Sequence, residues 1–322
     1  MQIQKIEFRK ERDFTSVLGD SIKFLKQNFK PLFSSIILVI GPIILLTGLA
    51  YSYMQTVIMS NSFSGMGGMN MFNETYFLSL GAVYLLMFIN TVLLNSVVYN
   101  FMCLYNEKPA GEKITVSEVA SRVWSSLGRV LLSMLLFLFV IVIIGGICVL
   151  IGIGFGSMGS GMGAAGAIVV VLLVLFIFFG MLILTPVLAY GVSAGFYVVI
   201  RDKKFIFDAF RTVRRYLSGN FWWTWLIMIV ALIALSVLQL LFNLPASIMT
   251  VSETFTRMRS ITHGTAMPES GNSILLMVLY TIGMFFTTCS SAILHLVCGF
   301  NFLSQEEKHE GQGLMSRMDE IK

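Results

Sequence analysis

Charged residues are scarce in this chain of 322 residues: Asp, Glu, Lys and Arg make up only 12% of it, whereas hydrophobic residues make up 56%. A soluble globular protein carries about 25% charged residues and needs them to cover its surface in water. This chain lacks the polar groups for such a surface. The composition therefore excludes an ordinary soluble protein and predicts that lipid surrounds most of the chain.

Long stretches of the sequence contain no charged residue at all. Because about 20 apolar residues rising 1.5 Å each cross a 30 Å hydrocarbon core, each stretch predicts a transmembrane helix. The stretches do not show the alternation of apolar and polar residues that is typical of membrane β-barrel strands. We predict an all-α integral membrane protein with a single six-helix domain over residues 1–322, with spans at about 31–59, 76–104, 130–155, 164–200, 221–250 and 272–303 and a short tail at 304–322.

Histidine and cysteine are also rare, with three and four residues. The sequence shows no CxxC pair, no Ser-His-Asp order, no cluster of metal ligands and no phosphate-binding glycine loop leading into a helix. The cysteines all fall in apolar runs, where small packing side chains are the usual role. We therefore expect no enzymatic activity and no cofactor.

The basic residues are distributed unevenly over the connecting segments. Of the 22 Lys and Arg residues, 20 lie in the N-terminal segment, the second loop, the fourth loop and the C-terminal tail. Only Arg257 and Arg259 lie in the other loops. Basic segments stay on the cytoplasmic side during insertion, so the pattern predicts a bacterial inner-membrane protein with both ends in the cytoplasm. The first 30 residues hold no apolar core of a cleaved signal peptide.

The net charge of +5 is explained by this asymmetry and requires no nucleic acid. A Lys or Arg beside a membrane is attracted to anionic headgroups by about 1 kcal/mol. We therefore predict contact with anionic headgroups at the cytoplasmic face. The side chains that we expect to make this contact are those of Lys23, Lys26, Lys30, Arg211, Arg214 and Arg215.

Short basic segments with apolar residues at helical spacing precede the first, third and fifth apolar runs, at 14–29, 116–127 and 206–217. Each one predicts an amphipathic helix that lies in the headgroup layer. Asn28-Phe29 and Asn220-Phe221 also match at the start of two runs. We predict three pseudo-repeats of an amphipathic helix followed by a membrane hairpin, arranged around an axis along the membrane normal. Chance similarity among apolar segments is the alternative.

Short motifs occur in two regions: Phe207-Asp208-Ala209-Phe210 running into Tyr216-Leu217 and Asn220-Phe221-Trp222, and Phe300-Asn301-Phe302-Leu303 followed by Glu310-Gly311. On these motifs the chain resembles a broad bacterial family of multi-pass membrane proteins of unknown function. The family is related to the membrane domain attached to some glycerophosphoryl diester phosphodiesterases, and the resemblance implies a six-helix bundle. In that family the phosphodiesterase activity belongs to a separate soluble barrel with Glu, Asp and His metal ligands. This chain has three His and no soluble stretch of that length, so we do not expect the activity here.

Polar residues inside the apolar runs are candidate functional groups, because they are costly in hydrocarbon. His295, Asn95 and Asn90 form a candidate intramembrane site for a proton path, a solute path or a metal ligand. Gln239 and Asn243 lie in the fifth run. The simpler interpretation is hydrogen bonding between helices, worth about 0.6 kcal/mol per bond. One His cannot hold a metal alone, and no charged residue is present in the runs for coupled transport.

Small and sulfur-containing residues suggest two further features. The motifs Gly152-x-x-x-Gly156 and Gly191-x-x-x-Gly195 predict close approach between helices. The loop after the first run is rich in methionine, whose soft thioether selects Cu(I). A flexible Gly-Ser-Met linker is the alternative for this loop. The candidate copper ligands are Met66, Met69 and Met71.

Two classes of function remain open on this basis. Polar residues concentrate at the predicted cytoplasmic surface, which favours a non-enzymatic membrane scaffold or assembly partner with an unidentified protein partner. The alternative is a channel or transporter for a small or lipophilic solute that passes along the repeat axis. The glycine motifs suit a homo-oligomer as well as a monomer.

Overall fold

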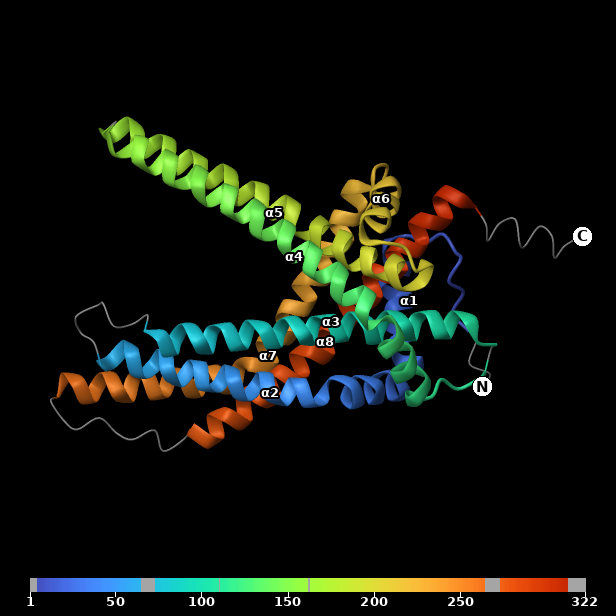
Figure 1. Cartoon of the computed structure of the whole chain (residues 1–322), viewed down its shortest axis with the longest axis horizontal. Helices are drawn as coiled ribbons and strands as arrows, with labels where there is room; N and C mark the ends of the chain where they lie inside the picture. The colour runs from blue at the N-terminus through green and yellow to red at the C-terminus, as the bar shows by residue number, and fades with distance from the viewer. Residues whose placement is uncertain (1–4, 65–72, 110, 162, 264–272, 312–322) are drawn as a thin grey trace, which may run out of the picture. The chain divides into compact units, whose positions relative to one another are not determined.

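The fold is all-α, as the sequence predicts. The computed structural model describes residues 5–64, 73–109, 111–161, 163–263 and 273–311, and no strand occurs in these ranges. Six of its helices contain segments long and apolar enough to cross a membrane, which supports a multi-pass membrane protein. The helices are α1 (Phe14–Gln27), α2 (Phe29–Ser64), α3 (Glu74–Glu107), α4 (Val116–Gly161), α5 (Gly163–Asp202), α6 (Ile206–Leu217), α7 (Phe221–Thr262) and α8 (Ser273–Glu310) (Figure 1).

The chain divides into two compact units, and each is described by itself. Unit 1 comprises the described residues up to Lys5 together with Ser21–Val123 and Ala231–Leu296. Unit 2 comprises Ile6–Asp20, Trp124–Val230 and the described residues from Val297 onward. The boundaries fall inside α1, α4, α7 and α8, so each of these helices contributes to both units. Below, the inner end of a spanning helix is the end beside the basic segments.

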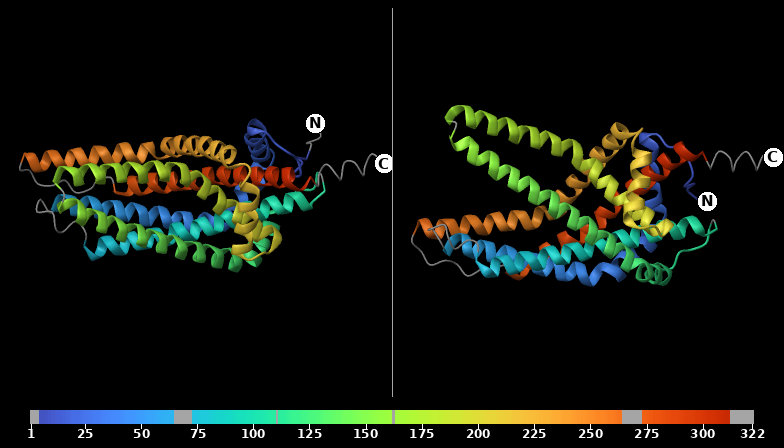
Figure 2. Two further views of the ribbon diagram at one scale, coloured as in Figure 1. Left: turned by 90° about the horizontal axis from the view of Figure 1, so that it is seen from above. Right: turned by 45° about the horizontal axis from the view of Figure 1, so that its top comes forward.

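Unit 1 is built on α2 and α3, which lie side by side (Figures 1 and 2). Helices suit this sequence because a helix satisfies its own backbone hydrogen bonds, which lipid cannot do. The outer end of α3 is capped by Asn73, whose side chain accepts a hydrogen bond of 2.9 Å from the backbone N–H of Tyr76. The core lies toward the inner end, where Phe101 is fully buried and packs edge-on against Phe24 of α1.

Unit 2 has its core at the inner ends of α5 and α8. Arg12 is almost fully buried there and lies over the ring of Phe300, 5.1 Å from its centroid. Its guanidinium also donates a hydrogen bond of 2.8 Å to Asp20. A second cation, Arg201, forms hydrogen bonds of 2.6 Å to both carboxylate oxygens of Glu306. Arg12 and Arg201 are therefore both paired with carboxylates, which offsets part of the cost of their desolvation.

The outer parts of α4 and α5 expose large apolar side chains. Phe139 of α4 and Phe176 of α5 are 63% and 77% exposed. The two helices are joined around Gly161 and Gly163 and separate along much of their length (Figure 2). Exposed apolar surface of this extent is expected to face lipid, because water would disfavour it.

Several helix boundaries differ from the sequence-based expectation. The second basic segment is not a separate helix, because α4 runs without interruption from Val116. The expected outer loop at 251–271 is helical as far as Thr262, where α7 ends. The connection expected between the third and fourth spans, at 156–163, belongs to α4 and α5 on either side of residue 162. Serine, threonine and glycine do not stop a helix whose neighbouring turns are already formed.

The apolar face of α6 is buried within unit 2. Ala209 and Val213 are buried, and the ring of Phe210 stacks on Phe137 with centroids 6.0 Å apart. The basic side chains of Arg211 and Arg214 are exposed on the other side of the helix. The apolar face of α6 therefore packs against protein, and only its basic face is free to contact headgroups.

Candidate functional site

A stripe of polar side chains on α7 joins this helix to α8 in unit 1. Gln239 donates to Ser291 at 3.4 Å, and Asn243 donates to Thr287 at 3.0 Å. The hydroxyls of Thr250 and Tyr280 lie 2.7 Å apart. As the residue number rises along α7, the number of the bonded residue in α8 falls by the same amount, as expected for two antiparallel helices. Interhelical bonds of this kind stabilise membrane helix pairs by about 0.6 kcal/mol each.

Asn90 links α3 to the same part of α8. Its amide Nδ2 donates to the hydroxyl of Thr288 at 3.0 Å. Thr287 and Thr288 therefore join α8 to α7 and to α3 at successive positions. The other side-chain atom of Asn90, Oδ1, is buried and accepts no hydrogen bond among the described residues. An unpartnered buried acceptor is uncommon in folded proteins, and an ordered water molecule is one way to satisfy it.

A cavity of about 460 Å³ lies on the outer side of these bonds. Its volume falls in the range of small-molecule sites, about 300–1,000 Å³. A rise of 1.5 Å per residue places Tyr51 about 33 Å along α2 from Phe29, close to the outer limit of the hydrocarbon core. The cavity is lined by Tyr51 and Gln55 of α2, Met87 of α3, Asn243, Ser247, Thr250 and Val251 of α7, and Tyr280, Met284 and Thr287 of α8.

Two glycines allow the walls of this cavity to approach each other. A Cβ atom on Gly48 would lie 2.6 Å from the Cα atom of Thr281, so α2 and α8 meet there backbone to backbone. A Cβ atom on Gly283 would lie 2.5 Å from Oδ1 of Asn243. Close approach of helices in lipid depends on such small residues.

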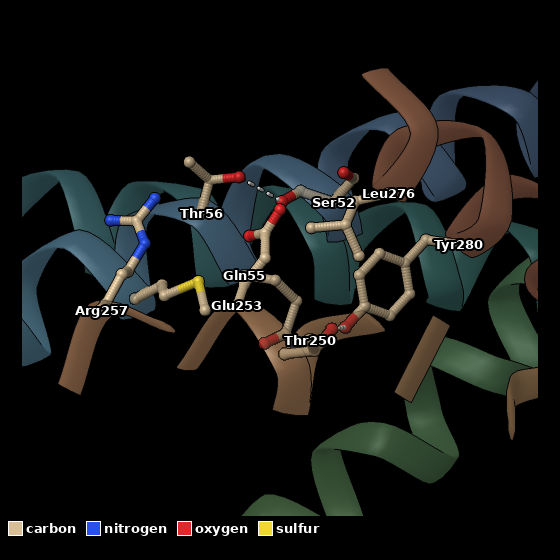
Figure 3. A pocket seen from close by; sticks show the side chains of 9 residues that line it. Ser52, Gln55, Thr56, Thr250, Glu253, Arg257, Leu276 and Tyr280 are labelled. Atoms are coloured by element: carbon tan, nitrogen blue, oxygen red, sulfur yellow. Dashed lines mark hydrogen bonds between the residues drawn. The ribbon is translucent and has the colours of Figure 1, made fainter. Parts of the chain in front are cut away.

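A smaller cavity of about 10 Å³ adjoins the larger one and shares Gln55, Thr250 and Tyr280 with it. Figure 3 shows Glu253 and Arg257 of α7 beside its α2 wall. Oε1 of Glu253 is buried without a hydrogen-bond partner among the described residues. The space suffices for about one water molecule, which would satisfy this oxygen.

The larger cavity combines hydroxyl and amide groups with apolar methionine walls. Its lining contains no carboxylate, no Lys or Arg and no His. Across the described residues, no three His, Cys, Asp or Glu side chains gather as metal ligands. This arrangement suits an uncharged molecule that has polar and apolar parts, since hydrogen bonds would fix its orientation and apolar contact would supply most of the affinity.

The structure distributes the predicted intramembrane site over several environments. Asn90 bonds to Thr288 at the inner border of the cavity. Asn95 donates to the carbonyl of Thr91 in its own helix at 2.9 Å. The ring of His295 lies edge-on to Tyr99, with centroids 5.8 Å apart. The lining of the cavity includes none of His295, Asn95 and Asn90.

The other predicted residues lie at the inner surface or outside the described ranges. Lys23, Lys26 and Lys30 are exposed, as are Arg211, Arg214 and Arg215 of α6. Arg215 lies 3.8 Å from Glu310 of α8. The candidate copper ligands Met66, Met69 and Met71 lie outside the described residues.

Sequence reasoning missed most of the cavity lining, above all Tyr51, Gln55, Thr250 and Tyr280. A usable signal was present on α7. Its polar residues at positions 239, 243, 247, 250, 254 and 257 recur every three or four residues, which is one face of a helix. The stripe crosses the expected end of the fifth span at residue 250, so its last two positions fall in the expected loop.

Comparison with protein-family models, with curated proteins and with solved structures found no match. The resemblance to the family related to phosphodiesterase membrane domains therefore stays a prediction.

Proposed function

We propose that this multi-pass membrane protein binds a small, uncharged amphiphilic solute in the cavity of unit 1 and acts as a channel or transporter for it. The observation that carries this proposal is the cavity of about 460 Å³ between α2, α3, α7 and α8, whose lining combines hydrogen-bonding groups of α2, α7 and α8 with the methionines Met87 and Met284. The geometry thus favours the function that the sequence ranks second. The proposal includes a bacterial inner membrane with both chain ends in the cytoplasm, which reporter fusions to each end would check.

The polar stripe on α7 is the physical reason for preferring a solute site. Polar side chains in membrane helices usually face the interior of a bundle or a water-filled cavity, because hydrocarbon offers them no partners. Ser247 is exposed on the cavity wall, and the adjacent Ile248 is 60% exposed but lies outside the lining. Two neighbouring residues of one helix thus have different surroundings, which makes them a matched pair for testing.

Cysteine substitution at these two positions tests whether the cavity holds water. We expect Ser247→Cys to react with a membrane-impermeant, positively charged thiosulfonate added to the outer side, because reaction requires a solvated thiolate. The thiol of Ile248→Cys is expected to stay unreacted, because we expect position 248 to face lipid. Equal reactivity of the two variants would contradict the proposal.

Filling the cavity tests whether a solute binds there. Ser247→Trp places an indole in the cavity, whereas Ile248→Trp adds the same group outside it. Native mass spectrometry of protein extracted from its own membrane is expected to detect a small molecule on the wild type and on Ile248→Trp, but not on Ser247→Trp. A molecule that stays bound to Ser247→Trp would show that it occupies another place, and an unliganded wild type would refute tight binding.

A second candidate function is the scaffold or assembly partner that the sequence favours. The observation in its favour is the outward face of α6, where Arg211 and Arg214 are exposed beside Phe207, which is 61% exposed. Aromatic and Arg side chains are typical of protein interfaces. Crosslinking in the native membrane, followed by mass spectrometry, is expected to recover a protein that is lost in Arg211→Gln/Arg214→Gln. Recovery of the same proteins from both forms would argue against this function.

A further inference from the structure

A second cavity of unit 1, separate from the proposed solute site, lies at the inner ends of α2 and α3. Its volume is about 670 Å³. It is formed by the junction of α1 and α2, the end of α3 and the connection from α3 to α4. The lining consists of Lys5, Lys26, Gln27, Asn28, Phe29, Lys30, Pro31, Tyr105, Lys108, Pro109, Gly111, Glu112, Lys113 and Ile114.

Five of the lining residues are lysines and only one is acidic. Two of these lysines are fixed by the protein itself. Lys108 forms salt bridges of 2.8 Å to Glu118 and 3.0 Å to Glu112. Lys5 donates hydrogen bonds to the carbonyls of Asn106 and Lys108, at 3.0 and 2.6 Å. These two ammonium groups hold the α3–α4 connection in place, and the pKa of Lys108 is raised by its hydrogen bonds to Glu118 and Glu112.

The other three lysines are not used in this way. Lys26, Lys30 and Lys113 are exposed, and none of them has an ion-pair partner among the described residues. They come from α1, α2 and the α3–α4 connection, so three chain segments bring positive charge to one hollow. Like charges held close together repel one another unless an anion lies between them.

Apolar side chains border the same cavity. Phe29, Pro31 and Ile114 are part of its lining, and Phe29 is 52% exposed. Phe29 also begins the candidate membrane span of α2, and Glu107 ends that of α3. The cavity therefore lies at the level where headgroups meet acyl chains, on the side that the charge distribution predicts to be cytoplasmic.

We propose that this cavity binds the phosphate group of an anionic ligand, with Lys26, Lys30 and Lys113 as the charged contacts and Phe29 beside the apolar part of the ligand. A phospholipid headgroup and a soluble phosphorylated compound share this chemistry. Lysine recognises phosphate as a point charge, so the three ammonium groups act together through their summed field.

Titration of the full-length protein in detergent tests the proposal with three probes: dihexanoyl phosphatidic acid, dihexanoyl phosphatidylcholine and inorganic phosphate. Calorimetry is expected to show saturable binding of phosphatidic acid to the wild type and at least tenfold weaker binding of the zwitterionic phosphatidylcholine. The triple variant Lys26→Gln/Lys30→Gln/Lys113→Gln is expected to bind phosphatidic acid at least tenfold more weakly. The corresponding triple change to Arg is expected to retain binding, because it keeps the charge.

The matched control is Arg9→Gln/Lys10→Gln/Lys203→Gln, which removes the same charge from exposed residues outside the cavity. Its affinity for phosphatidic acid is expected to stay within twofold of the wild type. Equal weakening in the two triple variants would reduce the effect to general surface charge and overturn the proposal, as would the absence of saturable binding of any phosphate probe.

A single change identifies the source of the phosphate. Phe29→Ser removes the apolar contact and leaves every lysine in place. Weaker binding of phosphatidic acid with unchanged binding of inorganic phosphate would assign the site to a lipid headgroup. Equal affinity for both probes, unaffected by Phe29→Ser, would assign it to a soluble phosphorylated compound.

Discussion

Replacement of Gly48 by Ala should force α2 away from α8 and destabilise unit 1. The added Cβ atom would lie 2.6 Å from the Cα atom of Thr281, 2.7 Å from its Oγ1 and 2.9 Å from its Cβ atom. Carbon atoms in contact lie about 3.5–4.0 Å apart, so the helices would have to separate by about 1 Å. The Cα and Cβ atoms of Thr281 do not move when its side chain changes rotamer, so a rotamer change cannot remove the clash with these two atoms.

The magnitude follows from comparison with a second glycine. Overpacking of a well-packed contact typically costs about 1–3 kcal/mol. Ala in place of Gly in a helix also favours folding by about 0.4–1 kcal/mol where space is available. Gly81 of α3 is such a place, because a Cβ atom there would meet nothing within 4 Å. Subtracting the change in unfolding free energy of Gly81→Ala from that of Gly48→Ala cancels the helix-propensity contribution. The remaining destabilisation of Gly48→Ala should equal about 1–3 kcal/mol.

Thermal unfolding in detergent measures this difference with a thiol-reactive fluorogenic dye. Cys103, Cys289 and Cys298 are buried and become reactive on unfolding, and a Cys148→Ala background removes the fourth thiol. At about 2–4 °C per kcal/mol, Gly48→Ala should melt about 2–12 °C below Gly81→Ala. A melting temperature of Gly48→Ala equal to or above that of Gly81→Ala would refute the close approach of α2 and α8.

Three further predictions concern polar groups. Asn243→Leu removes the 3.0 Å hydrogen bond to Thr287 and should lower the free energy of unfolding by about 0.6 kcal/mol, and by no more than about 1.7 kcal/mol. A double-mutant cycle with Thr287→Val measures the coupling energy between the two residues. A coupling energy close to zero would show that the hydrogen bond is absent. Arg12→Ala leaves Asp20 and buried carbonyls without their cation, and this should lower the free energy of unfolding by about 3–5 kcal/mol. The loss should appear as a large decrease in thermal stability, which Arg12→Lys restores only partly because Lys lacks the forked guanidinium. Full restoration by Lys would contradict this account. The hydrogen bonds of Lys108 to Glu118 and Glu112 raise its pKa above the ordinary value of 10.5. Their contribution to stability is therefore complete below pH 10.5 and is lost as the pH rises through the raised pKa. Lys108→Met should lower the melting temperature at about pH 8 and reduce its decrease above pH 10.5, and an unchanged pH profile would rule the contribution out.

The sequence predicted the class of fold because a chain of this composition is surrounded by lipid, and lipid permits few kinds of backbone structure. Six uncharged apolar runs led to six helices that can cross a membrane, and α2, α3 and α5 include the expected spans with a few residues added at each end. Helix ends were less predictable. A helix that is already nucleated continues through Ser and Thr, which is why α7 reaches Thr262 and α4 begins at Val116.

Contacts between helices were not predictable from short motifs. Gly191 belongs to a G-x-x-x-G motif, yet a Cβ atom there would meet nothing within 4 Å. Gly195 of the same motif faces the ring of Phe210, at 3.5 Å from the nearest atom. The closest approach to a backbone atom among the described glycines instead involves Gly48, which has no glycine partner one turn away. Whether a small residue is used depends on which helix lies opposite, and a single sequence does not contain that information.

By itself the sequence determined that lipid is the main solvent of this protein, that its backbone must close its hydrogen bonds within helices, and that its basic residues gather beside alternate ends of those helices. These properties are sums over many residues, so they survive errors at any one position. Only the tertiary structure decided which polar groups meet. Asn243, Ser247 and Thr250 became part of one cavity lining because α8 lies antiparallel to α7 in one register. Lys26, Lys30 and Lys113 line a second cavity because three chain segments meet there. Both sites depend on residues far apart in the chain, and their distances are set by helix packing.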